Sequence, residues 1–330
     1  MIEISRRNLI TGAVCATSVS ALPRPLSAFA PAIGRQVPGI YRYTVGDMEV
    51  TAIADGAIKQ PLPEAYVKNA GTPEINAALA RLHMEQSKIT APLTAIVINT
   101  GTKLVVIDTG LGPDMFQQSK GAVGQFHANL AAAGITREAV DIVIISHMHR
   151  DHVGGLLASD NSPAFPNAEI MVPEAEWAFW SDDGNLSRMA TGSIPEINFK
   201  NNRRVFAALK KNVTRYAAGR ELLPGITSLA APGHTPGHTA HILSSGQKRV
   251  LVQADLTAYS ALLFVHNPAW HVFFDMDGGI AESSRRRIYD MVAVEEMLVQ
   301  GYHLPFPALG HIDKTGASYS FSPAAWNSTL

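Results

Sequence analysis

The segment Ser146-His-Met-His-Arg-Asp-His152 constrains the fold of this chain more than any other part of its sequence. The continuous apolar run Val140–Ser146 leads directly into it, and such a run is typical of a strand buried on both faces. Alternate residues of an extended chain point to one side, so two ligands can share one metal ion while the next two, after a turn, face a second. The sequence therefore predicts a buried strand that ends in a metal site. Its four candidate ligands are His147, His149, Asp151 and His152.

Three further candidate ligands each follow a strand-like run in the second half of the sequence. A single histidine or carboxylate at a strand end is usually a turn residue or a helix cap, but three in the same position favour a common site. They are His234, in the loop after Ile226–Ala230; Asp255, at the end of Val250–Asp255; and His303, at the end of Leu298–His303.

The histidine and cysteine content decides which ligands a metal site can have. The chain has twelve histidines and one cysteine, and this Cys15 lies within the first thirty residues. A site must therefore be built from imidazole and carboxylate, which suit zinc, although iron or manganese could bind the same atoms. We expect two divalent ions per chain, with zinc as the first choice.

Residues 1–30 have the features of an export signal. Arg6 and Arg7 precede a modest apolar stretch, Leu9–Leu22, and Ala28-Phe-Ala30 has the small-residue pattern of a cleavage site. The arginine pair favours the twin-arginine route, and an ordinary signal or an uncut anchor is the alternative. The apolar stretch is short for a membrane span. We predict a periplasmic or secreted protein without stable membrane insertion, in which residues 31–330 form a single domain.

Runs rich in Val, Ile and Thr alternate with turns and helix-like segments over the rest of the sequence. In each half, strands lead to a histidine-bearing loop and then to a helix and another strand. This order predicts an α+β fold in which two sheets pack face to face and helices cover them. The segment Ser181–Asn202 contains Gly, Asn and Pro, and we interpret it as a long loop near the site.

The order H-x-H-x-D-H, a separate His, an Asp and a last His resembles the metallo-β-lactamase superfamily. Val106–Gly110 is part of this resemblance to the superfamily, and Gly233–Thr239 and Gly301–Pro307 are similar to segments of its methyl parathion hydrolase and lactonase branch. The resemblance implies an αβ/βα four-layer sandwich with a binuclear metal centre at one edge. It also implies the ligand sets: His147, His149 and His234 for one ion; Asp151, His152 and His303 for the other; and Asp255 as the bridge between them.

The remaining histidines and one aspartate have predicted roles around these ligands. His311 competes with His303 for the last ligand position, and His303 is favoured because it directly follows a predicted strand and matches the family. His311 is then expected either to support a metal ligand or to line the pocket. His238 and His241 are expected to pack against or cap the next strand. Asp108, at the end of an apolar run, is predicted to accept a hydrogen bond from a ligand imidazole and so fix its orientation.

These ligands predict a hydrolase that needs no serine nucleophile. Two ions can share a hydroxide that attacks a carbonyl carbon or a phosphorus atom, and no Gly-x-Ser-x-Gly elbow occurs in the sequence. Asp255 or Asp151 would then carry a proton to the leaving group. Aromatic residues predict an apolar pocket suited to a lactone, an aryl ester or a phosphotriester. The pocket candidates are Trp180, Phe199, Phe273 and His311.

Two other functions remain open. A glyoxalase II-like thioesterase would share the metal ligands and bind its thiol moiety through basic residues; Arg285–Arg287 is the candidate cluster, and we interpret it as the solvated start of a helix. A non-catalytic metal-binding periplasmic protein would instead need only a closed site of four ligands. The net charge of −1 without a basic block argues against nucleic-acid binding. The expected partner is a small-molecule ester, lactone or phosphotriester, and homodimer formation is left open.

Overall fold

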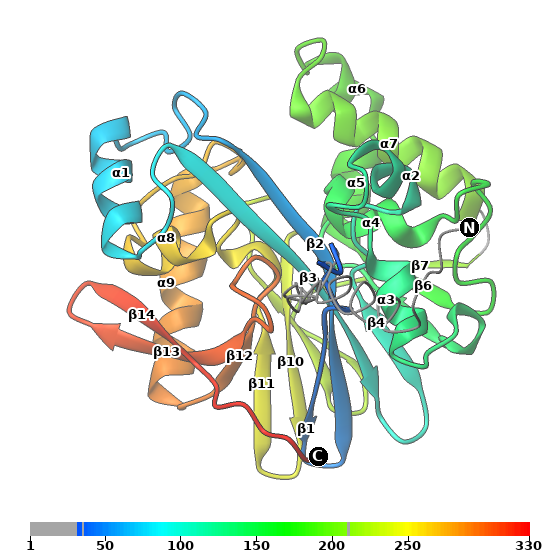
Figure 1. Cartoon of the computed structure of the whole chain (residues 1–330). Helices are drawn as coiled ribbons and strands as arrows, with labels where there is room; N and C mark the ends of the chain where they lie inside the picture. Colours follow the sequence, from blue (N-terminus) through cyan, green and yellow to red (C-terminus); the bar gives the residue numbers. More distant parts are fainter. Residues whose placement is uncertain (1–31, 35, 210–211) are drawn as a thin grey trace, which may run out of the picture. The chain divides into compact units, whose positions relative to one another are not determined.

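Two seven-stranded sheets form the centre of the unit Pro38–Leu330 (Figure 1). The computed structural model describes residues 32–34, 36–209 and 212–330. The chain divides into the units Met1–Val37 and Pro38–Leu330, and all described helices and strands belong to the second. The predicted export signal, residues 1–30, lies outside the described residues. Among the described helices, none has both the length and the apolar run that crossing a bilayer requires.

The first sheet has an antiparallel half and a parallel half, in the order β1-β2-β3-β4-β5-β6-β7. Strands β1 to β4 pair antiparallel, whereas β4 to β7 pair parallel. Parallel neighbours need a crossover connection, and helices supply it here, so the carboxyl ends of β4, β5 and β6 meet at one edge of the sheet. The strands are β1 (Ile40–Val45), β2 (Met48–Pro61), β3 (Lys88–Asn99), β4 (Leu104–Ile107), β5 (Ile142–Ile144), β6 (Glu169–Pro173) and β7 (Val213–Tyr216).

The second sheet has the order β14-β13-β12-β11-β10-β9-β8. Its neighbouring strands are antiparallel except for β11 and β12, which are parallel. The segments that follow β11 and β12 therefore leave the sheet at the same edge. The strands are β8 (Glu221–Leu223), β9 (Ile226–Ala230), β10 (Thr239–Ser245), β11 (Lys248–Val252), β12 (Leu298–Gln300), β13 (Leu309–Thr315) and β14 (Ser318–Pro323).

The two sheets pack face to face, and helices cover their outer faces. A shared core lies between the sheets and includes Val50, Ile96 and Ile144 from the first and Leu243 and Val250 from the second. Helices α1, α8 and α9 lie on one side of the paired sheets and α2 to α7 on the other (Figure 1). This arrangement confirms the predicted α+β class and the αβ/βα four-layer sandwich. The helices are α1 (Thr72–Arg81), α2 (Pro113–Gln118), α3 (Phe126–Ala132), α4 (Arg150–Val153), α5 (Glu174–Ser181), α6 (Asp183–Ser187), α7 (Ile194–Leu209), α8 (Ala261–His266) and α9 (Gly278–Val294), with short 3-10 turns η1 (Arg137–Ala139), η2 (Gly154–Leu156) and η3 (Ala254–Leu256).

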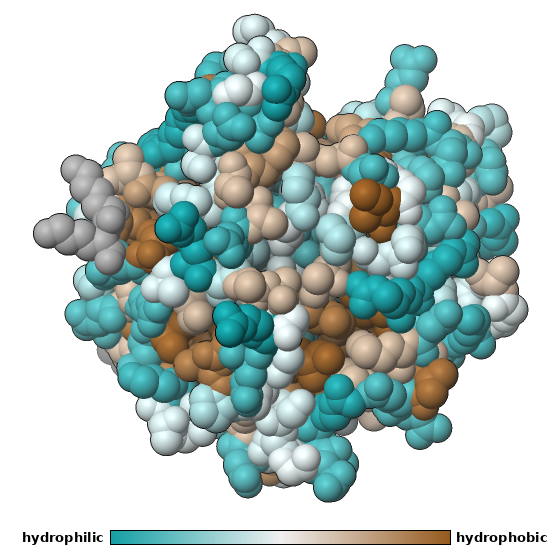
Figure 2. All heavy atoms as spheres, turned by 180° about the vertical axis from the view of Figure 1, so that it is seen from behind, coloured by the Kyte–Doolittle hydropathy of each residue, from teal (hydrophilic) through white to brown (hydrophobic). Residues whose placement is uncertain are grey.

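Apolar side chains attach each helix layer to its sheet. Leu130, Trp180 and Phe199 of the helices pack with side chains of the first sheet, and Ile288 and Val292 of α9 pack with the second. Each fully buried side chain of this size contributes about 1.5–3 kcal/mol of burial free energy. The face of the molecule seen in Figure 2 carries many hydrophilic residues between separate apolar patches.

The segment Ser181–Asn202 is mainly helical, so its interpretation as a long loop was wrong. Helix α7 buries Phe199, Phe206, Asn198 and Asn202 on one face. Asparagine has a low helix propensity and is seldom buried, which hides the helical period in the sequence. Both asparagines are buried here because their side chains hold the backbone of the ligand segment: Asn202 Nδ2 donates to Met148 O at 2.9 Å, and Asn198 Oδ1 accepts from the Arg150 N–H at 3.2 Å.

Arg285 is buried, so the interpretation of Arg285–Arg287 as a solvated helix start was also wrong. Helix α9 begins at Gly278, where the Asp277 side chain caps it by accepting the Ile280 N–H at 2.9 Å. Arg285 therefore lies inside the helix, on its inner face, and is 1% exposed. Of the three, only Arg287 is exposed, and Arg286 is half-buried. The cluster is thus no basic surface patch for a thiol cofactor.

Candidate metal centre

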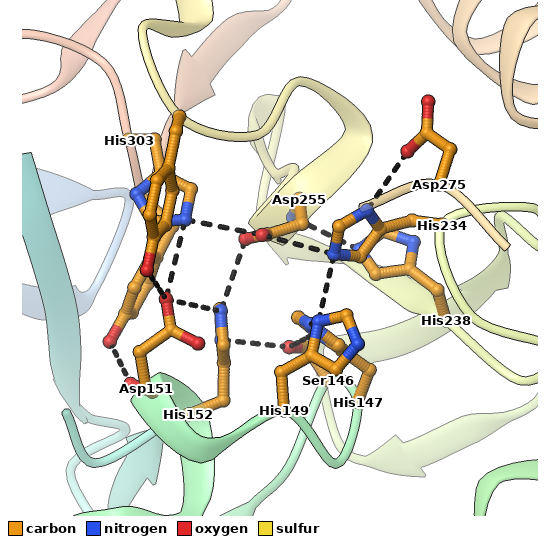
Figure 3. Close-up of polar contacts among 12 residues, drawn as sticks. Ser146, His147, His149, Asp151, His152, His234, His238, Asp255, Asp275 and His303 are labelled. Carbon is orange, nitrogen blue, oxygen red and sulfur yellow. Dashed lines mark hydrogen bonds and ion pairs between the residues drawn. The ribbon is translucent and has the colours of Figure 1, made fainter. Parts of the chain in front are cut away.

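Seven histidine and aspartate side chains from both halves of the chain converge at one edge of the paired sheets (Figure 3). Two come from the loop between β5 and α4, two from α4 itself, and the others from the loops after β9, β11 and β12. Parallel pairing brings the ends of β11 and β12 together, and β9 runs in the same direction as β11 because β10 pairs antiparallel with both. The seven are His147, His149, Asp151, His152, His234, Asp255 and His303.

The first ligand group consists of His147, His149 and His234. The His149 Nδ1 atom lies 3.0 Å from His147 Nε2 and 3.0 Å from His234 Nε2. One nitrogen from each ring lies within 4.8 Å of the others. Burial lowers the pKa values of His147 and His149 well below their usual range, and neighbouring histidines lower them further. These two rings are therefore neutral, which is the form of imidazole that binds a metal ion.

The second ligand group consists of Asp151, His152 and His303, which all lie within reach of one ion. Asp151 Oδ2 lies 3.6 Å from His303 Nε2 and 3.9 Å from His152 Nε2. The Tyr302 hydroxyl donates to the Asp151 carbonyl, and the Tyr259 hydroxyl lies 3.4 Å from Asp151 Oδ2. The two tyrosines thus fix the backbone and the side chain of this aspartate.

Asp255 lies between the two groups. Its Oδ1 atom is 3.1 Å from His152 Nε2, and its Oδ2 atom is 3.1 Å from His303 Nε2 and 3.3 Å from His234 Nε2. The Asp255 backbone is also held, because its N–H donates to His238 Nε2 at 3.0 Å. A carboxylate that faces both groups in this way has the geometry needed to bridge two ions.

Three of the ligand histidines are oriented through their second ring nitrogen. His152 Nδ1 lies 2.7 Å from Asp108 Oδ2, His234 Nδ1 lies 3.0 Å from Asp275 Oδ1, and His303 Nδ1 lies 2.8 Å from Pro92 O. An imidazole whose Nδ1–H donates to such an acceptor keeps the lone pair of its Nε2 directed into the site. Asp108 also accepts from the Ser146 N–H and hydroxyl.

The donor atoms fit two divalent cations. His152 Nε2 and Asp255 Oδ1 are fully buried, face each other at 3.1 Å, and have no hydrogen-bond partner among the described residues. Leaving such atoms without a partner is costly inside a protein. A cation between them would satisfy both, and imidazole with carboxylate is the donor set that zinc accepts.

The other histidines lie outside the two ligand groups. His238 Nδ1 contacts the Ala231 carbonyl at 2.9 Å, and its Nε2 accepts from Asp255, so this ring braces the loop that carries His234. His241 Nε2 lies 3.2 Å from the Tyr216 hydroxyl. His311 is exposed on β13. The alternation of side chains along a strand explains this exposure, because the neighbours of His311 in β13, Gly310 and Ile312, are buried.

A cavity of about 430 Å³ opens onto the ligands His149, Asp151, His234 and Asp255. Phe273 lines this cavity, and Trp180 lines an adjoining one of about 170 Å³ that shares Phe273 with it. Phe199 is fully buried behind Trp180, with ring centroids 4.7 Å apart, and lines neither cavity. His311 lines neither cavity.

Asp275 is one of the residues of this site that could not be found from the sequence, as are Tyr259 and Tyr302. Asp275 is buried and lies in the segment between α8 and α9, twenty residues beyond Asp255, where no strand precedes it. The only sequence signal is the acidic pair Asp275 and Asp277, which directly follows the aromatic stretch Trp270–Phe274. The folded path of this segment, rather than any local pattern, brings it to His234.

Known proteins resemble this chain in both sequence and structure. The family model described as Metallo-beta-lactamase superfamily matches residues 92–303. N-acyl homoserine lactonases from Bacillus sp and Bacillus cereus are 25% and 24% identical over 170 residues, which is 52% of this chain. The matched part of the chain spans 58% of the length of these relatives.

Two solved structures share the fold over most of both chains. AidC, a dizinc quorum-quenching lactonase solved with a product, has a TM-score of 0.80 and 25% identity, and the match covers 88% of this chain and 99% of AidC. AbOPH, a hydrolase of the beta lactamase superfamily, has a TM-score of 0.80 and 24% identity, covering 89% and 100%. Together with the family model and the converging ligand groups, these similarities show that the chain belongs to the metallo-beta-lactamase superfamily.

Proposed function

We propose that this protein is a metal-dependent lactonase whose substrates carry an apolar acyl chain. The observation that carries the proposal is the cavity of about 430 Å³, because the candidate metal ligands form part of its wall and most of the remainder is apolar. The names of the relatives, N-acyl homoserine lactonase and dizinc lactonase, support the same substrate class.

The lining of the cavity, with polar ligands at one part and apolar side chains elsewhere, suits a small polar ring joined to an apolar tail. The ring would lie against the ligands, and the tail along the aliphatic and aromatic wall, as is usual for cavities that orient a ligand through few polar groups. The adjoining cavity extends this wall as far as Met276. The apolar residues of the wall are Ile58, Pro63, Leu111, Ile194, Ile197, Ala258, Phe273 and Phe274.

Ring opening requires a water molecule to add to the lactone carbonyl and the ring C–O bond to break, with a proton passing to the leaving oxygen. Two divalent ions in these ligand groups would supply Lewis acidity and make water acidic near neutral pH. Asp255 and Asp151 are the carboxylates that face this space, so either can accept the proton of the water and return it to the ring oxygen. Tyr259 lines the same cavity, and its single O–H, which faces Asp151 Oδ2 at 3.4 Å, can turn to donate to the substrate carbonyl instead.

Metal removal tests the proposal. The protein with its metal content quantified should open an N-acyl homoserine lactone, lose this activity in a chelator, and regain it when zinc is returned. The panel should also contain a p-nitrophenyl ester, an aryl phosphotriester and a glutathione thioester, since the aromatic pair Phe273 and Phe274 also suits aryl groups. A preference for the thioester would favour the glyoxalase II-like alternative. Two bound ions without turnover of any substrate would contradict the proposal.

Ile197 tests the predicted position of the acyl chain. This side chain lines the cavity and is 43% exposed, so Ile197→Ala should leave stability nearly unchanged. Loss of its contacts should lower kcat/KM for an N-decanoyl substrate by about tenfold. An N-butanoyl substrate, whose shorter chain buries less apolar surface, should be less affected. Steady-state kinetics with both substrates checks the difference.

Val294 provides the matched control for Ile197. It is an aliphatic residue at the end of α9, 84% exposed and outside both cavities. Val294→Ala should change kcat/KM for neither chain length. An Ile197→Ala variant that loses activity equally on both substrates would argue against an acyl chain along this wall.

A further inference from the structure

We infer that Glu176 is a positioning residue that holds the two loops of the first ligand group in register with each other. One loop carries His147 and His149, and the other carries His234. The inference rests on the metal centre of the proposed function, but it does not depend on a lactone being the substrate.

The carboxylate of Glu176 joins the two loops directly. Its Oε1 atom accepts the Gly237 N–H at 2.7 Å, and its Oε2 atom accepts the Met148 N–H at 2.9 Å. Met148 stands between the two ligand histidines of its loop, and Gly237 follows His234 by three residues. Each oxygen thus binds one loop, so this side chain joins the two loops next to the ligand histidines, in addition to the Thr239 N–H that donates to Ser146 O at 3.1 Å.

The chemistry at Glu176 requires a carboxylate. Oε2 also accepts the Trp180 Nε1–H at 2.8 Å, so all three groups that it binds are donors. An ionised carboxylate only accepts hydrogen bonds, whereas the amide of glutamine would turn an NH₂ group towards one of these donors. Glu176 is fully buried, and the described residues place no lysine, arginine or histidine within ion-pair distance of it. Burying such a group is costly, and the loops supply the compensating hydrogen bonds.

The surrounding contacts leave little freedom for these loops to adjust. A Cβ atom on Gly237 would lie 2.4 Å from the Glu176 backbone nitrogen, so only glycine allows α5 and the loop to approach this closely. The Met148 peptide is held from its other side, where its carbonyl accepts from Asn202 at 2.9 Å. Trp180, which shares Oε2, packs its ring edge-on against His149 with centroids 5.8 Å apart.

The consequence is specific to one of the two ions. The second ligand group is held by other contacts, which include Asp108 on His152 and Pro92 on His303. Weakening the Glu176 contacts should therefore reduce affinity at the first group and leave the second largely unchanged. Residues that orient metal ligands without touching the metal typically change affinity by about 10- to 100-fold when replaced.

The experiment measures zinc affinity, not turnover. Metal-free protein is titrated with zinc against a chromophoric chelator so that both binding steps are resolved. Glu176→Gln should weaken one step by about 10- to 100-fold and change the other by less than about threefold. Glu174→Gln is the matched control, because Glu174 is exposed on the same helix; it should bind both ions as the unmodified protein does. Thermal unfolding of each metal-free variant is recorded alongside.

Equal weakening of both steps, or unchanged binding of both, would overturn the inference. If Glu176→Gln does not fold, Gly237→Ala replaces it, because the added methyl group pushes the same loop away from α5; it should show the same selective loss. Selective loss in either variant supports the inference even if the protein opens no lactone, so the two proposals can fail separately.

Discussion

Replacing Asp255 with alanine should lower kcat/KM for the lactone substrate by at least about a thousandfold, or about 4 kcal/mol of transition-state free energy. Among the residues that the structure describes, Asp255 is the one carboxylate within 3.3 Å of histidines from both ligand groups. Its loss would leave His152 Nε2 without the atom that it faces and would remove the bridge between the groups. Metal analysis should show fewer than two ions per chain in the variant.

Two comparisons make this result specific. Asp313→Ala removes an exposed carboxylate on β13, far along the same sheet, and should keep full activity. Asp255→Asn and Asp151→Asn, each compared at full metal occupancy, separate metal binding from proton transfer. Full turnover by either asparagine variant with two bound ions would show that the replaced residue is not the proton carrier.

The metal ligands could be predicted from the sequence because strand ends place them. Each of the residues His147, His234, Asp255 and His303 follows shortly after a strand of its sheet, and the apolar runs that precede them are recognisable without any structure. Parallel pairing then brings such positions to one edge, whatever the details of the loops. The four-layer arrangement could also be predicted, because each strand-rich half forms a sheet that packs one face on the other sheet and needs helices to cover its second face.

The residues that orient the ligands could be predicted only in part. Asp108 ends an apolar strand, as the ligands do, and its contact with His152 therefore follows from the same rule. Asp275 and Glu176 lie in a loop and in a helix, and their contacts depend on how these segments pack in three dimensions. Local sequence patterns contain no information about such packing. The helical period of α7 was hidden for a related reason, because its buried asparagines are stabilised by tertiary hydrogen bonds.

Replacing Arg285 with methionine should lower the free energy of unfolding by about 3–5 kcal/mol. The guanidinium group is 1% exposed and donates to the carbonyls of Leu256, Pro268 and Trp270. Its Nη2 atom lies 3.7 Å from Asp275 Oδ2, which has no hydrogen-bond partner among the described residues. Methionine fills a similar volume, but it leaves a buried carboxylate and three carbonyls without their donor, and removing one partner of a buried pair costs more than the pair contributes.

Urea unfolding of the metal-free protein measures this loss without the contribution of bound ions, which would otherwise add to stability. Arg287→Met, an exposed position on the same helix, should stay within about 0.5 kcal/mol of the unmodified protein. Because Asp275 Oδ1 contacts His234, the Arg285 variant should also bind zinc more weakly at the first ligand group. If Arg285→Met is as stable as the control, the buried guanidinium and its hydrogen bonds contribute nothing to stability beyond the volume that the side chain fills, and the prediction is wrong.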